Sequence, residues 1–498
     1  MSYYFVAIGG SGAKVLESLT HLSAAGAFPD EEKLYVMNID PDVGNGNLAR
    51  STKSLECYEV FQNATIGYAS PLFRTKVVLA RPFTWNPTEH NKCLDDVMSY
   101  QAYKEEPVGH LYRALYTKKE RTTLLNEGFR GHPSIGSAVM AKKIDLGNGD
   151  YTVDGETWSW LKNRVNEDVK TGSVARIFLT GSIFGGTGAA GLPTVAKVLR
   201  RTFDSFCESK KVVIGAGMVL PYFSFSAPAK NEVKGQVYAE AENFLTNTKA
   251  ALRYYSGAIK EERLFDSMYF TGDSSLDQIN KFSVGSSSQE NDAHVVDFYV
   301  ALAAIDFYQT PVDKLKNCSY ISHNKPDAFE WGDFPELADM TTQSSPNLKT
   351  RMGQYIRFVF SYLLLVKPVL KELSAGNIPA YKYPWFADYL EKVNADSPEV
   401  QRFEQYVEDF VRWLAQMTNN TSRRQMSIIN HDIIRGINPS VLDGNIMDRL
   451  IIGGDEGNIS LHEVWIRLCE EQKAADTTRD AQGFGKFLRL LYDSCEAR

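Results

Sequence analysis

The stretch Ile-Phe-Gly-Gly-Thr-Gly-Ala-Ala-Gly, residues 183–191, decides the fold of this chain. Residues 174–180 before it form an apolar run rich in β-branched side chains, which is typical of a buried strand. Residues 192–201 after it carry apolar side chains at helical spacing. Glycines in a strand–loop–helix unit let backbone N–H groups converge on an anion, Thr187 adds a donor, and the helix start is electropositive. The stretch predicts a phosphate site. The alternative is a glycine-rich turn needed only for tight strand–helix packing.

Length and composition limit the classes of protein to which the chain can belong. With 498 residues, 43% hydrophobic and 23% charged, it is expected to form two or three globular domains. The net charge of −7 argues against a general nucleic-acid-binding surface. The six cysteines are scattered without a CxxC pair, which argues against a disulfide framework or a zinc site. No apolar run is long enough to span a bilayer and the start of the chain enters a strand at once, so we expect a cytoplasmic protein without a signal peptide.

A second strand–glycine loop–helix unit opens the chain. Residues 3–8 favour a strand and lead into Gly-Gly-Ser-Gly-Ala-Lys, residues 9–14, and then into an apolar helical pattern. The loop lacks the GxxxxGK pattern of a Walker A element, and Val15 occupies the third glycine position of a GxGxxG pattern. Its lysine, Lys14, is placed where it could contact phosphate.

The next expected strand, residues 33–40, ends in the polar residues Asn38 and Asp40. An aspartate at this point, opposite a glycine loop, suits a ribose hydroxyl or a hydrated magnesium ion. The alternative is a turn residue before Pro41. Residues 44–127 have no clear pattern, and we interpret them as an elaboration inserted into a simpler core. A third glycine-rich loop follows at residues 128–136, where Arg130 and His132 are candidates for contact with a terminal phosphate or are simply solvated.

Strands and helices alternate through the following part of the chain. Residues 212–221 and 266–273 favour buried strands, and residues 233–252 and 289–307 favour helices, the latter capped by Asn291 or Asp292. This alternation predicts a Rossmann-like α/β domain with a mostly parallel sheet, whose loops converge at the carboxyl ends of its strands.

Taken in order, these loops resemble those of the tubulin/FtsZ superfamily, in particular its divergent bacterial tubulin-like members, over about the first two thirds of the chain. The segments that carry the resemblance are Gly10-Ser11-Gly12, Asn38-Ile39-Asp40, residues 131–136 (Gly-His-Pro-Ser-Ile-Gly), Gly185-Gly186-Thr187-Gly188 and residues 221–225 (Pro-Tyr-Phe-Ser-Phe). The chain departs from the family at Ala13, at Phe184 and at Ala189, and the family's ribose-binding acid is missing. The resemblance implies GTP or GDP with Mg²⁺, held by the loop residues including Gly131 and His132. It also implies base recognition by Asp297 of the helix over residues 289–307, with Asn291 as a second candidate.

Residues 330–337 resemble the family's seventh loop, which is offered to the nucleotide of the next subunit in a filament. Trp331 stands where the family has asparagine, whereas Asp333 and Glu336 occupy the two acid positions. The resemblance implies that these two acids orient the attacking water from a neighbouring subunit and are the catalytic residues. The alternative is that they are surface acids in a proline-containing turn.

The last third of the chain has mainly helical patterns, over residues 355–373, 400–417, 461–469 and 487–495. We therefore expect a tubulin/FtsZ-like domain at residues 1–310 and a mainly helical domain at residues 311–498, which begins with the loop at 330–337. The family has a mixed α/β domain here, so this module is expected to serve a protein partner.

The sequence predicts a slow GTPase that self-associates in a filament or oligomer, without nucleic acid, direct membrane insertion or a resident metal site. One alternative is a nucleotide-bound structural or switch component that does not polymerise, in a defence or membrane-remodelling system. Another is an NAD(P)-dependent oxidoreductase, because Gly10-x-Gly12 together with Asp40 imitates a Rossmann site.

Overall fold

The computed structural model describes most of the chain up to residue 496. The residues outside the description are 29–32, 66–69, 145–154, 227–236, 262, 274–275, 280–282, 284, 317, 321–328, 336–346, 391–395, 419–425, 431–446, 448, 453–458, 471–482 and 497–498.

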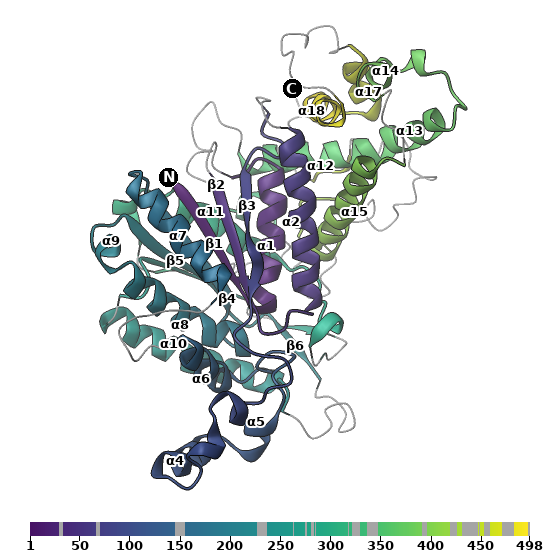
Figure 1. Ribbon diagram of the computed structural model, residues 1–498. Coiled ribbons are helices and arrows are strands. Elements are labelled where there is room, and N and C mark those ends of the chain that lie inside the picture. The colour runs from purple at the N-terminus through teal and green to yellow at the C-terminus, as the bar shows by residue number, and fades with distance from the viewer. Residues whose placement is uncertain are drawn as a thin grey trace.

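A seven-stranded parallel sheet forms the centre of the molecule, with the strand order β3-β2-β1-β4-β5-β7-β9 (Figure 1). Its strands are β1 (Ser2–Ile8), β2 (Lys33–Ile39), β3 (Lys76–Trp85), β4 (Ala175–Ser182), β5 (Val212–Val219), β7 (Ser267–Thr271) and β9 (Ser319–Tyr320). The order reverses between β1 and β4, because β2 and β3 add on one side of β1 and the later strands add on the other. Loops at the carboxyl ends of strands diverge at such a reversal and leave a crevice for a ligand. The predicted Rossmann-like, mostly parallel α/β fold is confirmed.

Each face of the sheet has its own apolar core, because successive side chains of a strand point to opposite faces. In β1, Tyr3 and Phe5 pack on one face, and Tyr4 and Val6 pack on the other. The helices that cover the first face are α1 (Gly9–Ala24), α2 (Gly46–Ala64) and α11 (Val295–Gln309). Those on the second face are α6 (Pro133–Lys143), α7 (Glu156–Lys170), α8 (Gly186–Thr202), α9 (Asp204–Glu208) and α10 (Phe244–Glu261). A two-stranded parallel ribbon of β6 (Phe223–Phe225) and β8 (Asp277–Ile279) lies beside the main sheet.

Two predicted helices begin later than expected. The helix expected over residues 289–307 is α11, which begins at Val295 and is capped by the Nδ1 atom of His294, not by Asn291 or Asp292. The preceding residues are held instead by the start of α2: Gln289 O accepts from Asn47 N, and Asn291 N donates to the Asn47 side chain. These bonds compete with helical ones, so residues 289–294 stay outside the helix. The helix expected over residues 233–252 begins at Phe244 in α10, and residues 227–236 lie outside the description.

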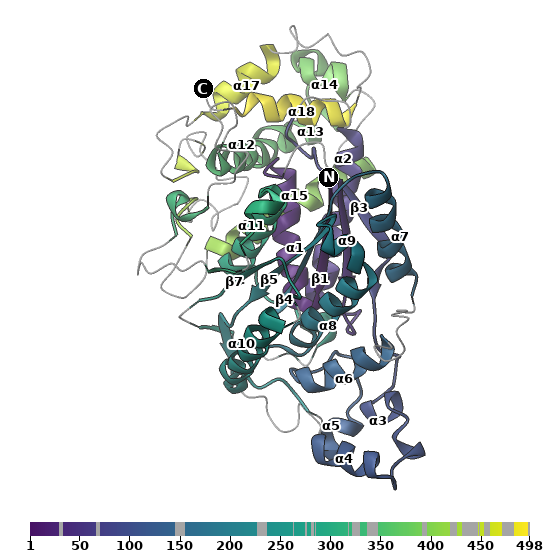
Figure 2. The ribbon, with the colours of Figure 1, turned by 90° about the vertical axis from the view of Figure 1, so that its left-hand side faces the viewer.

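The stretch of residues 44–127, expected to be inserted, divides into two parts. Helix α2 and strand β3 belong to the central layers, since β3 pairs with β2 in the sheet. The remainder projects beyond the carboxyl ends of the strands as an arm (Figure 2), and contains α3 (Leu94–Val97), α4 (Pro107–Leu115) and α5 (Lys118–Thr122). The chain returns from this arm to the sheet domain at the third glycine-rich loop, next to α6.

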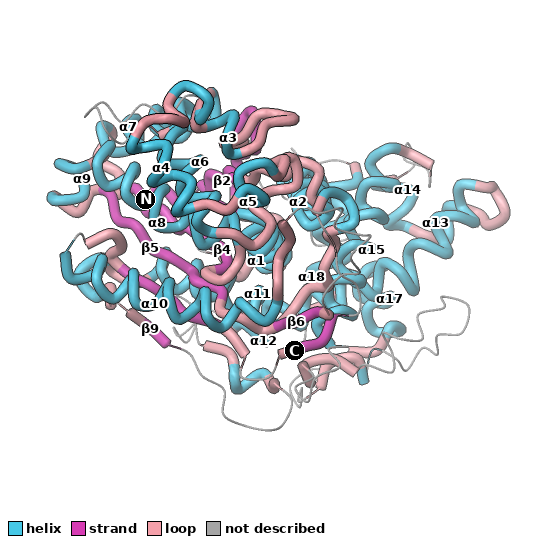
Figure 3. Tube along the Cα trace, turned by 90° about the horizontal axis from the view of Figure 1, so that it is seen from below, coloured by secondary structure: helices cyan, strands magenta, loops and turns pink. Residues whose placement is uncertain are grey.

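The described residues after β9 are mainly helical, as predicted. The helices are α12 (Leu348–Ser361), α13 (Lys367–Ser374), α14 (Pro384–Tyr389), α15 (Pro398–Thr418), α17 (Leu461–Glu470) and α18 (Phe484–Ser494). A π-helical turn, Tyr362–Val366, joins α12 to α13. Helix α15 packs against α2, and α13, α14 and α15 lie on the side of α2 that faces away from the sheet (Figure 3). One continuous apolar cluster includes residues of the sheet, α11, α12 and α15, so these helices share a core with one face of the sheet. In the part of the chain that the structure describes, no helix has the length and apolarity needed to cross a membrane.

Candidate functional site

The starts of helices α1 and α8 face each other where the strand order reverses. Helix α1 begins at Gly9 directly after β1, and α8 begins at Gly186 shortly after β4. A side chain on Gly9 would come within 3.1 Å of the Thr187 Cβ atom, which measures how closely the two starts approach. Neither first turn contains an acidic side chain. Because the first N–H groups of a helix have no partner within the helix, both starts present donors and a positive electrostatic potential.

Two of the glycines are required by this arrangement. Gly9 has φ +71°, a left-handed conformation that a residue with a side chain rarely adopts. A Cβ atom on Gly188 would lie 2.4 Å from the carbonyl oxygen of Ser182, so α8 can start against the end of β4 only without a side chain there. The glycines thus provide close packing, as the alternative interpretation of the sequence held, and at the same time leave the helix starts uncovered.

A cavity of about 150 Å³ lies between these helix starts. The glycine-rich wall of the cavity is formed by Gly9, Gly10, Ser11, Gly185, Gly186 and Thr187. A second wall is formed by four side-chain amides, those of Asn45, Asn47, Gln289 and Asn291. A third wall is aromatic and contains Phe184, Tyr222, Phe223, Phe225, Tyr238 and Phe244. A cavity with hydrogen-bond donors on one side and apolar and amide groups on the others suits a ligand with an anionic part and a flat polar part.

Asp40, Asp42 and Glu127 also line the cavity. Asp40 is 2% exposed, and one of its carboxylate oxygens, Oδ2, has no hydrogen-bond partner, while the other accepts from the backbone of Asp42. Burial raises the pKa of Asp40 to about 8. Asp42 accepts hydrogen bonds from the backbone N–H groups of Gly44 and Ser286, and Glu127 pairs with Arg130. Asp40 is therefore the acid in this set with a buried oxygen still free to bind.

Lys14 lies in the cavity wall one turn into α1, and its side chain is 3% exposed. Its Nζ atom is 2.9 Å from the Asp297 Oδ2 atom and donates to the Tyr222 hydroxyl at 2.7 Å. The Tyr222 hydroxyl donates in turn to the Asp297 Oδ1 atom at 3.2 Å, and the His294 backbone donates to Oδ2. The aspartate is fully buried and does not line the cavity, whereas the lysine and the tyrosine do.

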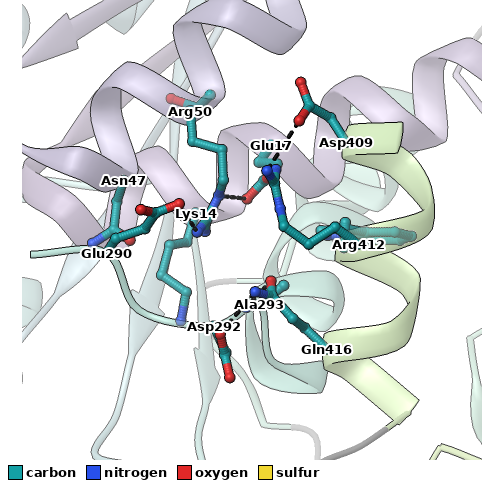
Figure 4. A network of polar contacts seen from close by, with 12 residues as sticks. Lys14, Glu17, Asn47, Arg50, Glu290, Asp292, Ala293, Asp409, Arg412 and Gln416 are labelled. Carbon is teal, nitrogen blue, oxygen red and sulfur yellow. Dashed lines mark hydrogen bonds and ion pairs between the residues drawn. The ribbon is translucent and has the colours of Figure 1, made fainter. Parts of the chain in front are cut away.

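A second network of polar contacts connects the amide wall to the C-terminal helices (Figure 4). Arg50 of α2 is 2.9 Å from Glu17 of α1 and also donates to the carbonyl oxygen of Asn291. Arg412 of α15 pairs with the same glutamate and with Asp409. Gln416, one turn further along α15, accepts from the Ala293 backbone at 3.0 Å and donates to Asp292 at 2.7 Å. The segment that lines the cavity ahead of α11 is thus held from both sides by α2 and α15.

The structure brings most of the predicted nucleotide-binding residues together in this cavity. Those that line it are Gly10, Ser11, Asp40, Gly131, Gly185, Gly186, Thr187, Gly188 and Asn291. Four others do not line it: Gly12, Asn38, His132 and Asp297. Gly12 packs against the backbone of β1 and β4, and Asn38 is buried beside Thr84. His132 pairs with Glu120 of the arm.

The predicted catalytic acids lie elsewhere. Asp333 ends a short 3-10 turn, Trp331–Asp333, where its carboxylate accepts from the Glu330 backbone at 2.9 Å and its carbonyl accepts from Tyr299. It does not line the cavity of its own chain. Glu336 lies outside the described residues. Their catalytic role therefore stays a prediction.

Sequence reasoning missed several residues of the cavity. Asn45 and Asn47 fall in the stretch interpreted as an inserted elaboration, although an asparagine before an apolar helix is a typical cap, and Asn45 caps α2. Gln289 was placed inside a helix. The polar run Gln-Glu-Asn-Asp over residues 289–292, directly before an apolar helix, was the available signal for a segment that contacts a ligand or a neighbouring helix.

Comparisons with known proteins do not assign this chain to a family. A scan against protein-family models finds no match, and no curated protein matches the sequence. Among solved structures, CetZ from Methanosaeta thermophila strain DSM 6194 is similar over 54% of this chain, with 12% sequence identity and a TM-score of 0.24. The similar region spans 45% of the CetZ chain, less than half of its length.

Proposed function

We propose that the protein binds a guanine nucleotide in the cavity between α1 and α8. The observation that carries the proposal is the convergence of two acid-free, glycine-rich helix starts on one cavity at the reversal of a parallel sheet. Helix starts of this kind bind phosphate through their free N–H groups and their positive ends. The amide and aromatic walls offer hydrogen bonds and stacking surfaces to a base, and the order of the loop motifs resembles the tubulin/FtsZ superfamily.

Asp40 is suited to a magnesium ion that accompanies the phosphates. Its free, buried Oδ2 atom points to a missing partner, and a magnesium ion that displaced the proton of this carboxyl would gain the carboxylate oxygen as a ligand. No cluster of three or more metal-ligating side chains occurs among the residues with described positions. A metal held by one carboxylate and by substrate phosphates needs no such cluster, and it would neutralise charge on the phosphates during hydrolysis.

We further propose that hydrolysis is slow in the isolated chain and is completed by a neighbouring copy. Asp333 lies outside the cavity of its own chain, so it can act on a bound nucleotide only if another copy brings it there. This arrangement agrees with the resemblance of residues 330–337 to a loop that acts across a subunit contact. Each chain would then hold its triphosphate by the two helix starts, and an acid from the next copy would orient the attacking water.

Thermal unfolding with GTP, ATP and NAD tests the binding proposal. A ligand present at 100 times its Kd stabilises the native state by about 2.7 kcal/mol. GTP with Mg²⁺ is expected to raise the unfolding midpoint by several degrees, and NAD is expected to leave it unchanged. A shift with NAD alone would support the oxidoreductase instead, and no shift with any of the three would refute nucleotide binding.

A second candidate is a nucleotide-dependent switch that does not polymerise. The network from Asn291 through Arg50 and Gln416 to α15 favours it, because a ligand that moves the amide wall would also move a C-terminal helix. Sedimentation with a non-hydrolysable GTP analogue separates the two candidates. Pelleting that increases with protein concentration supports assembly, whereas nucleotide binding with no sedimenting species supports the switch.

A further inference from the structure

Lys14 and Tyr222 separate Asp297 from the cavity. The carboxylate of Asp297 receives hydrogen bonds or charge from three groups: the Lys14 ammonium, the Tyr222 hydroxyl and the His294 backbone N–H. Both of its oxygens are engaged, and its side chain is fully buried. A ligand in the cavity therefore meets the lysine and the tyrosine first. A carboxylate that already has these partners is poorly placed to accept hydrogen bonds from a base.

Lys14 adjoins the start of α11, through its contacts with Asp297 and Tyr222. Tyr222 stacks near His294, the cap of α11, with 4.5 Å between the ring centroids, and Asn291 lies just before that cap. The acid-free helix starts of α1 and α8 account for the phosphates, so the remaining polar groups of the cavity face the rest of the ligand. Lys14 is the cation in this part of the wall, and two of its hydrogen-bonding directions are used by Asp297 and Tyr222. An ammonium group has three donors, which leaves one for a ligand.

We propose, on the basis of the proposed nucleotide binding, that Lys14 is the residue that selects the base, through its remaining donor, which is shared between the adjacent O6 and N7 acceptors of guanine. Guanine presents two adjacent acceptors on this edge, and a lysine contacts them favourably. Adenine presents the N6 amino group beside N7, so a donor placed there meets another donor. The 2-amino group of guanine takes no part in this contact. Selection by Lys14 thus differs from selection by the Asp297 carboxylate, which would accept from N1–H and from the 2-amino group.

Calorimetry with Mg²⁺ can distinguish selection by Lys14 from selection by Asp297. It compares the binding of GTP, ITP and ATP to the full-length protein. ITP keeps O6 and N7 but lacks the 2-amino group. We expect GTP and ITP to bind within about threefold of each other and ATP to bind at least about tenfold more weakly. Binding of ITP tenfold or more below that of GTP would overturn the inference and assign selection to the 2-amino group. This comparison needs no variant, so it holds whatever the stability of a substituted protein.

A double variant tests the residue itself. Lys14→Met combined with Asp297→Asn removes both charges together, so no buried charge is left unpaired. We expect GTP affinity to fall about tenfold and the GTP-to-ATP ratio to approach one. The matched control is Lys367→Met with Glu404→Gln, which removes an ion pair of 2.9 Å between α13 and α15, away from the cavity, and should leave the ratio unchanged.

The outcomes also separate failure of this inference from failure of the proposed function. If the double variant keeps the guanine preference of the wild type, Lys14 does not select the base, but nucleotide binding stands. If the wild-type protein binds none of the three triphosphates, both the inference and the proposed function are refuted. A loss of protein stability alone would weaken the binding of all three triphosphates together and would not change the ratio of their affinities.

Discussion

Replacing Asp40 by asparagine should remove a large part of the pH dependence of stability between about pH 4 and pH 8. Burial raises the pKa of Asp40 from 3.8 to about 8 in the native state, whereas the unfolded chain loses this proton near pH 4. Between these values the native state binds more protons than the unfolded state, so the free energy of unfolding falls as the pH rises. The slope from one such group approaches about 1.4 kcal/mol per pH unit, and the total reaches roughly 5 kcal/mol as an upper bound.

Urea unfolding of the nucleotide-free wild-type protein and of Asp40→Asn at pH 5, 6, 7 and 8 measures this effect. The variant cannot ionise at this position, so the stability of the wild type relative to the variant should decline steadily across the series. Asp313→Asn, a substitution of an exposed aspartate in a short turn, is the control and should retain the wild-type pH dependence. Parallel pH profiles for the wild type and Asp40→Asn would refute the assignment of a buried, protonated carboxyl in the cavity.

Three further predictions follow from the packing of the site and the core. Gly186→Ala places a methyl group 3.0 Å from the Phe129 Cβ atom, and the resulting overpacking should weaken GTP binding about tenfold, as measured by calorimetry. The control is Gly257→Ala, whose added methyl group would have no atom within 4 Å and should not change GTP affinity. Trp413→Ala removes a fully buried side chain of α15 whose Nε1 donates to Ser18 of α1. It should lower the free energy of unfolding of the sheet domain by about 3–5 kcal/mol, and unchanged stability would mean that α15 does not support that domain. Asp333→Asn should slow GTP hydrolysis on the order of 10²-fold without changing GTP affinity. In the wild type, the rate of hydrolysis per molecule should rise with protein concentration. A constant rate from nanomolar to high micromolar concentration would contradict completion of hydrolysis by a second copy.

The layers of the fold could be predicted from local patterns because each central strand is buried on both faces. Runs such as residues 174–180 are mainly apolar, and a strand buried on both faces needs no alternation of polar side chains. The same patterns failed at residues 289–294. There the residues before the helix are held by Asn47 and Gln416, which lie far away in the sequence, and a local pattern does not identify these partners.

The glycine loops of the site could be predicted because backbone geometry restricts which residues fit. Gly9 needs a positive φ angle and Gly188 has no room for a side chain, so both positions require glycine, which can be recognised in the sequence. The ion-pair partner of a charged side chain cannot be recognised from the local sequence in this way. Lys14 and Asp297 are separated by most of the sheet domain in sequence, and their pairing depends on how α1 packs against α11. That pairing moves Asp297 out of the cavity wall, which the motif alone did not reveal.

The measurement that tests the central claim most directly is a structure of the protein with a non-hydrolysable GTP analogue and Mg²⁺. We predict density for the phosphates against the first turns of α1 and α8, with the base beside Lys14 and Tyr222. An analogue bound elsewhere, or a cavity that remains empty at saturating analogue, would contradict nucleotide binding between the two helix starts.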